Sequence, residues 1–189
     1  MKLLLPFLTI LLLLQGCAGG LIVVAGTAVA VASDERTVST IIEDDRLAVD
    51  ALNLINELDI NKDEIRINLI TNNGYLLVIG QANNEQQKQM ISDELNTLKN
   101  VKEVYNQLRI GPTIGFTQQS KDSWITTKTK SKLTAHEDVN AFQIKVVTEN
   151  SEVFLIGRVD KKTADAATNI SRQISGVKHV NRVFQMISE

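Results

Sequence analysis

The chain has 189 residues, with 20 Lys and Arg against 22 Asp and Glu, giving a formal net charge of −2. A charge near zero excludes a generally basic nucleic-acid binder, so we expect no nucleic-acid partner. One Cys and two His exclude an intramolecular disulfide and leave little for a metal site. We therefore expect neither a metal nor a cofactor.

The N-terminus has the features of a secretion signal. Met1 and Lys2 precede an almost unbroken apolar run from Leu3 to Leu14. Such a run forms roughly 18 Å of helix, which is too short for a bilayer core of about 30 Å. A short buried helix is the alternative, but a Leu-rich run at the extreme N-terminus favours a signal. We predict that residues 1–16 are a signal peptide.

The signal ends in Leu14-Gln15-Gly16-Cys17, which resembles the lipobox of bacterial lipoproteins, although Gln15 replaces the usual Ala or Ser. The resemblance implies cleavage before Cys17, a diacyl group on its sulfur, and acylation of the new α-amine by a chain such as palmitate. Because Ala18 rather than Asp follows Cys17, the resemblance also implies the outer membrane. Each buried CH₂ contributes about 0.8 kcal/mol, so these chains would form a lasting anchor.

A second apolar stretch, residues 18–32, is rich in Gly and Val and forms helices poorly. It is short for a transmembrane span, which remains the alternative. We predict that residues 17–43 are the lipidated N-terminus and an apolar or flexible tether.

The rest of the chain repeats itself at a spacing of about 77 residues. The apolar run 76–80, which ends in Gly80, matches the run 153–157, which ends in Gly157. Alternating apolar residues lie upstream of each Gly and predict half-buried strands. Helical segments follow at about 82–98 and 160–174. A third strand with a Val-x-x-Val pattern closes each copy.

Each copy also begins with a helix that has one apolar face. The spacing i, i+4, i+8 is shared by two sets of residues: Leu47, Ala51 and Ile55, and Ile125, Thr129 and Leu133. Residues 72–74 and 149–151 predict hairpin turns. Glu149 and Glu152 flank the second turn and are expected in a solvated loop.

The predicted fold class is therefore α+β, with two tandem domains of helix, strand, strand, helix and strand. Each domain has a three-stranded mixed sheet packed by two helices. We place the first domain at residues 44–111, a linker at 112–120 and the second domain at 121–189. Gly80 and Gly157 are expected to be structural, because a glycine ending a buried strand usually permits a bend or close packing.

This arrangement resembles the BON domain, which is a short αββαβ unit with a Gly after an apolar second strand. Two such domains behind a lipobox resemble the dual-BON-domain lipoproteins of the Gram-negative outer membrane. The resemblance covers essentially the whole chain. It implies lipid anchorage facing the periplasm, phospholipid binding, and roles in envelope stress, envelope integrity and cell division.

The two copies carry opposite charge. Residues 34–111 contain 14 acidic and 8 basic side chains, a net charge of −6, and residues 112–189 contain 8 acidic and 11 basic, a net charge of +3. A basic domain on a lipid-anchored protein favours anionic phospholipids such as phosphatidylglycerol and cardiolipin.

The first helix of the second copy carries a candidate phospholipid site. Its residues lie at i, i+3, i+7 and i+11 beside the core stripe: Lys121, Trp124, Lys128 and Lys132. A Trp flanked by Lys on an amphipathic helix suits a membrane interface. The alternative is that Trp124 packs in the core or between the domains and that the Lys residues are merely solvated. The first copy lacks this stripe, so we expect it not to bind lipid but to act as a spacer or as a docking surface for the second.

Two functions follow from these observations. The first is an outer-membrane lipoprotein that binds anionic phospholipid through the first helix of the second domain. The alternative is a lipid-anchored scaffold for a protein partner in envelope assembly or at the cell wall, using the acidic first domain or a strand edge. The sequence contains no assembled catalytic constellation, so we predict that the protein is not an enzyme.

Overall fold

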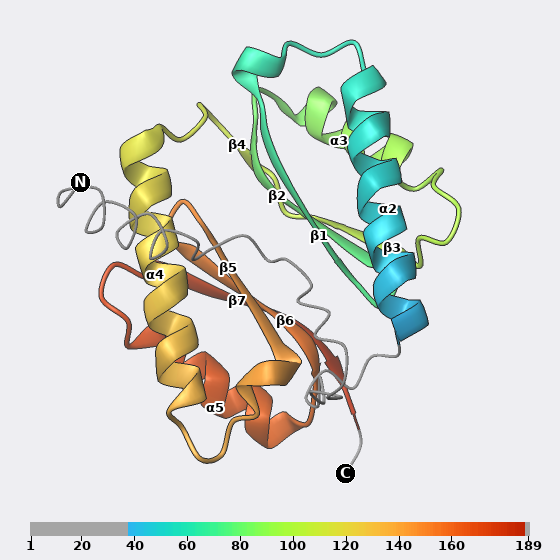
Figure 1. Cartoon of the computed structure of the whole chain (residues 1–189). Coiled ribbons are helices and arrows are strands. Elements are labelled where there is room, and N and C mark those ends of the chain that lie inside the picture. The colour runs from blue at the N-terminus through green and yellow to red at the C-terminus, as the bar shows by residue number, and fades with distance from the viewer. Residues whose placement is uncertain (1–37, 188–189) are drawn as a thin grey trace, which may run out of the picture. The chain divides into compact units, whose positions relative to one another are not determined.

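The computed structural model describes residues 38–187. The predicted signal peptide, the anchor Cys17 and the tether segment 18–32 lie outside the described residues. The described residues belong to one compact unit, which contains two sheets with their helices (Figure 1).

The first copy contains these elements in order: α2 (Val38–Glu57), the 3₁₀-helix η1 (Lys62–Glu64), β1 (Arg66–Asn72), β2 (Tyr75–Ala82), α3 (Glu85–Leu95), β3 (Glu103–Asn106) and β4 (Arg109–Ile110). The central strand β2 is antiparallel to β1 and parallel to both β3 and β4. The last two strands keep one register along β2, so they form a single interrupted strand. Leu108, in the interruption, is fully buried in the helix-side core.

The second copy contains the corresponding elements: α4 (Phe116–Thr134), the 3₁₀-helix η2 (Ala141–Gln143), β5 (Ile144–Glu149), β6 (Glu152–Val159), α5 (Lys161–Arg172) and β7 (His179–Met186). The central strand β6 is antiparallel to β5 and parallel to β7. Both copies therefore have the predicted αββαβ order and mixed sheet, and the α+β prediction is confirmed.

Both first helices begin earlier than the sequence predicted. Helix α2 begins at Val38, inside the segment expected to be tether, and α4 begins at Phe116, inside the expected linker. The apolar spacing that revealed these helices starts only where a side chain reaches the core. The first turns precede that point, so periodicity could not show them.

The inner faces of the two first helices are buried as predicted. Leu47, Ala51 and Ile55 on α2 are each 5% exposed or less. Their counterparts on α4, the stripe from Ile125 to Leu133, are each 2% exposed or less. Side chains at the same spacing therefore pack both helices against their sheets.

In each copy, the first two strands are joined by a two-residue turn in which both residues have positive φ. The φ angles are 54° and 79° at Asn73 and Gly74, and 50° and 68° at Asn150 and Ser151. Such turns match the right-handed twist of the strands they join. The second turn places a Ser, rather than a Gly, in the left-handed region.

A buried aspartate holds the first turn from the adjacent helix. The Asp44 carboxylate accepts hydrogen bonds from the backbone N–H groups of Asn73 and Gly74, both at 2.8 Å. Asp44 is only 3% exposed. These contacts tie α2 to the tip of the β1–β2 hairpin.

The second copy repeats this contact. The Asp122 carboxylate accepts from the N–H groups of Asn150 and Ser151, also at 2.8 Å, and is 4% exposed. Gln118 donates to both Asp122 and the Ser151 hydroxyl. The two aspartates are 78 positions apart in the sequence, so the clamp is a feature of the repeated fold.

The central strands β2 and β6 are buried on both faces. Along β2, Leu76 and Val78 face the helix-side core, whereas Leu77 and Ile79 lie in a separate cluster with Phe154 and Ile156 of β6. The two sheets therefore pack face to face, with the helices on their outer sides (Figure 1). An unbroken apolar run is typical of a strand covered on both sides.

Polar contacts surround this sheet-on-sheet interface. The Glu149 carboxylate accepts from Arg66 Nε and Gln81 Nε2, both at 3.0 Å, and Glu149 is 4% exposed. Glu152 pairs with Arg109 through two hydrogen bonds of 2.7 and 3.1 Å. The expectation of a solvated loop for these two glutamates is therefore wrong. The arginines and the glutamine that bind them belong to the other copy, so local sequence context could not reveal these contacts.

Candidate functional site

Helix α4 presents the predicted stripe to solvent. Trp124 is 54% exposed, and Lys121, Lys128 and Lys132 are also exposed. None of these ammonium groups pairs with a carboxylate within residues 38–187. The alternative that Trp124 packs in the core or between the domains does not hold. The helix thus offers one aromatic ring and three cations to a ligand.

The structure adds a residue that sequence reasoning missed. Phe116, the first residue of α4, is 84% exposed. It lies eight residues before Trp124, which is a rotation of about 80° around a helix of 3.6 residues per turn. Both rings therefore project from the solvent side of α4. The signal for Phe116 was its apolar character in a polar segment.

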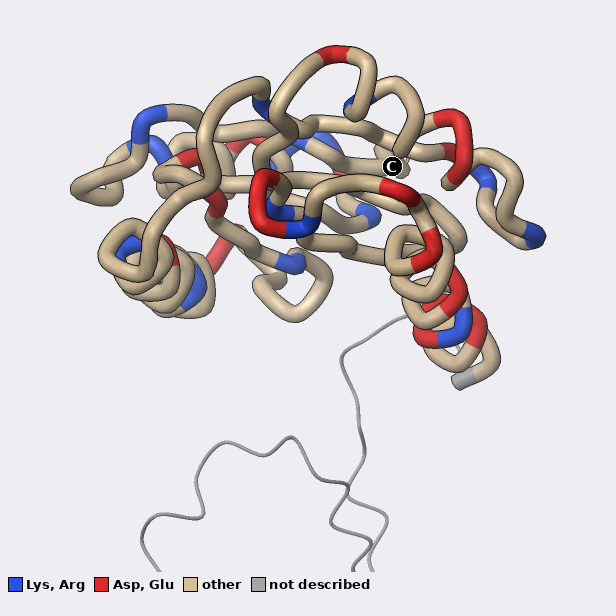
Figure 2. Tube along the Cα trace, turned by 90° about the horizontal axis from the view of Figure 1, so that it is seen from above, with Lys and Arg blue, Asp and Glu red and all other residues tan. Residues whose placement is uncertain are grey.

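The positions on α2 that are equivalent to Lys121 and Lys128 carry carboxylates. Glu43, Arg46 and Asp50 stand where α4 has Lys121, Trp124 and Lys128. Figure 2 shows acidic residues concentrated along α2 and basic residues along α4. The same fold therefore displays an acidic helix in one copy and a basic, aromatic helix in the other.

Gly80 and Gly157 each occupy a position where a strand passes very close to its neighbour. A Cβ atom at Gly80 would lie 2.0 Å from the carbonyl oxygen of Arg66, and one at Gly157 would lie 2.1 Å from that of Gln143. Gly80 also has a φ of +130°, which other residues rarely adopt. These contacts give both glycines a packing role.

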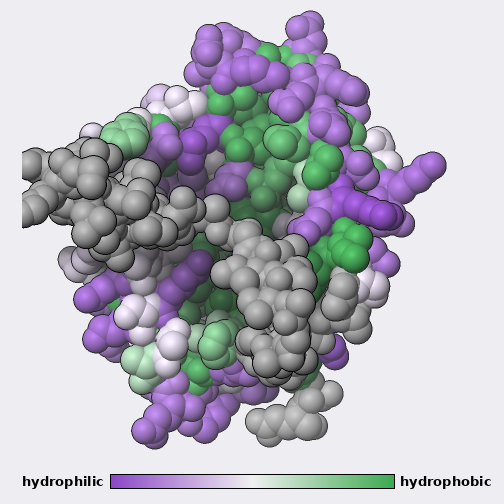
Figure 3. Space-filling model, viewed as in Figure 1, coloured by the Kyte–Doolittle hydropathy of each residue, from purple (hydrophilic) through white to green (hydrophobic). Residues whose placement is uncertain are grey.

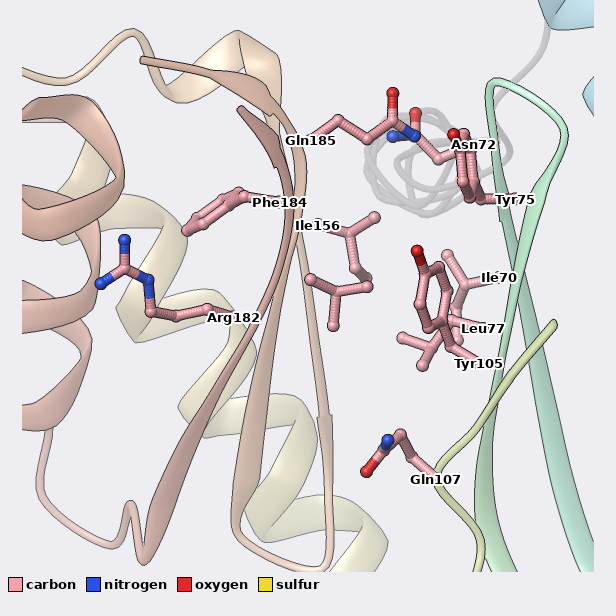
Figure 4. A pocket seen from close by; sticks show the side chains of 11 residues that line it. Ile70, Asn72, Tyr75, Leu77, Tyr105, Gln107, Ile156, Arg182, Phe184 and Gln185 are labelled. Carbon is pink, nitrogen blue, oxygen red and sulfur yellow. The ribbon is translucent and has the colours of Figure 1, made fainter. Parts of the chain in front are cut away.

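A small cavity lies between the two sheets, with a volume of about 170 Å³. Figure 4 shows Ile70, Leu77 and Tyr105 on one side of it and Ile156 on the other. Tyr75 stacks on Tyr105 with 6.0 Å between ring centroids. A hydrogen bond to Glu103 and burial raise the pKa of Tyr105 to about 12, so its hydroxyl stays protonated.

Arg182 has its backbone at this cavity but its side chain elsewhere. Figure 4 shows the guanidinium on the far side of β7, where it pairs with Asp165 at 2.8 Å. No metal-binding cluster of His, Cys, Asp and Glu occurs among residues 38–187. Within that part of the chain, α4 is thus the surface that combines unpaired cations with exposed aromatic rings.

Comparison with known proteins bears on both copies. The pattern of the BON domain matches residues 44–112 and 121–187. The chain is 41% identical over 174 residues to outer membrane lipoprotein DolP of Haemophilus influenzae, an alignment that spans 92% of this chain and 90% of the relative. The chain belongs to the dual-BON-domain outer-membrane lipoproteins. As a member, it is lipid-anchored at the outer membrane and faces the periplasm.

The chain also resembles two other proteins to different degrees. The chain is 41% identical over 155 residues to the 21 kDa hemolysin of Actinobacillus pleuropneumoniae, covering 82% of this chain and 79% of the relative. Among solved structures, CdsD, a structural protein of the type III secretion system of Chlamydia trachomatis, is 16% identical with a TM-score of 0.31. That match covers 75% of this chain and 92% of CdsD. The two relatives that are similar in sequence are named as a lipoprotein and a hemolysin rather than as enzymes.

The position of the protein at a membrane rests on this membership. None of the helices within residues 38–187 has the length and apolar character needed to cross a bilayer. The predicted lipid anchor, Cys17, lies outside the described residues.

Proposed function

We propose that the protein binds anionic phospholipid through α4 and thereby supports the integrity of the outer membrane, including at the division site. The observation that carries this proposal is the exposed Trp124 beside Lys121 and Lys128 on a helix whose opposite face is buried. Phosphatidylglycerol and cardiolipin are the lipids expected to bind, because their headgroups are anionic.

The chemistry of the helix suits a lipid surface. An indole ring is stable at the headgroup level, where its apolar body is buried and its N–H remains near water. Each Lys close to an anionic surface contributes about 1 kcal/mol before screening by salt. Phe116 adds a second ring, which would enter the bilayer near the start of α4.

The anchor makes weak binding sufficient. Acylation of Cys17 would hold the second domain close to the bilayer, so that binding by α4 becomes an intramolecular event with a high effective concentration. A contribution of a few kcal/mol from α4 would then keep it on the surface for most of the time. The name hemolysin, given to a relative, is in keeping with activity at membranes.

The test uses residues 33–189, which contain every described helix and strand and the sheet-on-sheet interface. Trp124 is the only Trp, so its emission reports on α4 directly. Vesicles of phosphatidylglycerol should shift the emission to shorter wavelength, and vesicles of phosphatidylcholine should not.

A pair of variants on the same helix locates the site. Lys128→Glu reverses a charge beside Trp124, whereas Lys130→Glu makes the same change on another side of α4. With about 1 kcal/mol per unit charge, Lys128→Glu should weaken binding roughly 30-fold, and Lys130→Glu should have a much smaller effect. Equal losses from both variants, or vesicle binding without a Trp124 shift, would contradict the proposal.

A further inference from the structure

The two ends of the sheet-on-sheet interface use matching positions but are filled differently. Three residues at one end correspond by strand register to three at the other: Tyr75 to Glu152, Tyr105 to Asn181, and Gln185 to Arg109. At the second end, the Glu152 carboxylate accepts hydrogen bonds from Asn181 of its own copy and from Arg109 of the other. These bonds join the two sheets at that end.

The first end holds the cavity of about 170 Å³ instead. Tyr75 stacks on Tyr105 of its own copy, and both rings line the cavity together with Gln185 of the other copy. The same three positions therefore form an ion pair with its polar neighbour at one end and border an open space at the other. Because the fold can close these positions, the cavity belongs to this end and is not required by the fold.

The lining of the cavity is mainly apolar and presents no charge to its interior. Aliphatic side chains come from both sheets: Ile70, Leu77, Ile156 and Val183. Figure 4 shows uncharged amides at the ends of the cavity, with Asn72 and Gln185 toward Tyr75 and Gln107 at the opposite end. Sites for small molecules have this composition, in which a few polar groups in an apolar pocket fix the orientation of the ligand.

Charge and size together define the class of ligand. Arg182 is the charged residue of the lining, and its guanidinium is directed to the far side of β7, so an ionic ligand would be buried without a partner. An apolar cavity of about 150 Å³ takes up benzene, whereas drug-sized ligands need roughly 300 Å³ or more. Amide side chains both donate and accept hydrogen bonds, which suits a hydroxyl group.

We propose that the cavity between the sheets binds a small uncharged amphiphile, namely a ring or chain of about six carbon atoms that carries one hydroxyl group. Its apolar body would lie between Leu77 and Ile156, and its hydroxyl would bond to the amide of Gln107 or Gln185. A lipid acyl chain shares the apolar chemistry, but most of its length would stay outside a cavity of this size. The site is therefore assigned to a free molecule, and it is independent of lipid binding by α4.

The experiment titrates residues 33–189, which contain both sheets and their helices, with 1-hexanol and follows the methyl NMR signals. The methyls of Leu77 and Ile156 should shift and saturate, whereas those of Ile125 and Val146 in the helix-side core should not. Hexanoate should bind at least about tenfold more weakly, because its charge would have no partner.

Three outcomes of the titration would overturn the proposal. If hexanol caused no saturable shift at Leu77 and Ile156, the cavity would accept water at most. Equal binding of hexanoate would contradict an uncharged ligand. Monomeric dihexanoylphosphatidylcholine tests the lipid source, and tighter binding of this lipid than of hexanol would contradict a free molecule.

Two variants close the cavity with residues that the opposite end already uses. Leu77→Phe installs the counterpart of Phe154, and the larger side chain should reduce hexanol binding at least about tenfold by filling the space. Tyr75→Glu combined with Gln185→Arg installs the counterpart of the Glu152–Arg109 pair and should have the same effect. Unchanged binding in either variant, once its methyl spectrum shows that it is folded, would overturn the proposal.

Matched controls change other places. Arg109→Gln alters the opposite end of the same interface and should leave hexanol binding unchanged. A similar loss in this variant would mean that binding depends on the interface as a whole, which would contradict a site in the cavity. Lys128→Glu should weaken lipid binding but not hexanol binding, so this test and the lipid test fail separately.

Discussion

The helices α2 and α4 hold the same place in two copies of one fold, yet their outer faces have opposite character. Both bury the same inner stripe, and both use a buried aspartate to hold a hairpin turn. Outside, α2 is acidic with an apolar row (Figure 3), whereas α4 is basic with exposed rings. The shared features are those on which folding depends. The differing features are free to vary, and that is where we place phospholipid binding.

The largest expected effect concerns the shared glycines. Gly157→Ala should destabilise the protein by about 3 kcal/mol, because a Cβ there overlaps a backbone carbonyl that cannot easily move. Gly80→Ala should cost roughly 1–2 kcal/mol more, because its positive φ adds backbone strain. Urea unfolding of both variants measures the difference. Gly115→Ala is the control, since a Cβ at that position meets nothing within 4 Å.

Gly80→Ala would destabilise the protein no more than Gly157→Ala only if the positive φ at residue 80 added no strain. That result would contradict the prediction and make the two positions equivalent despite their different backbones.

The aspartate clamps should differ between the copies. Asp44→Ala should cost about 2 kcal/mol, because two backbone N–H groups lose a charged acceptor. Asp122→Ala should cost more, since the clamp also stabilises Ser151 in the left-handed region, where the first copy has Gly74. Thermal and urea unfolding provide the comparison, with Asp45→Ala, an exposed neighbour, as the control.

Ser151→Gly should remove the difference between the clamps by relieving the strain at that turn. A larger cost for Asp44→Ala than for Asp122→Ala would show that the turn residue does not set the strength of the clamp.

The smallest expected effect depends on pH. Burial acts to raise the pKa of Glu152, but hydrogen bonds from Arg109 and Asn181 outweigh it and hold that pKa below its usual 4.5. The folded protein therefore favours the carboxylate. This contribution is fully present above pH 4.5 and is lost as the pH falls through the folded pKa.

The loss should be about 1 kcal/mol or less, because Arg109 is largely exposed. The first copy has Tyr75 at the position of Glu152, so this acid-sensitive contact has no counterpart there. Unfolding at pH 7 and below 4.5 should differ less in Arg109→Gln than in the natural protein. An unchanged pH dependence in that variant would assign the effect to other carboxylates.

The sequence predicted the features that depend on residue spacing within a single helix or hairpin. The inner stripes of α2 and α4, the two hairpin turns and the exposed position of Trp124 all follow from spacing within a single element. Phe116 was missed because the first turn of α4 precedes the first buried residue. The partners of Glu149 were missed because Arg66 is 83 residues away.

The exposed apolar row of α2, which consists of Ile42, Val49 and Leu52, was missed for a different reason. Apolar residues at two faces of one helix overlap in the sequence, so Ile42 and Val49 are hidden among the residues that fill the core. They became visible only when the structure separated the buried face from the exposed one, and when α4 supplied a helix of the same kind for comparison.

The sheet-on-sheet interface makes each copy depend on the other. Leu77 and Ile79 on one side, and Phe154 and Ile156 on the other, are all buried by the opposite copy. Either half alone would present a flat apolar sheet to water, a surface prone to aggregation. Each half is therefore the solvent shield of the other, and removal of either copy would expose the apolar face of the one that remains.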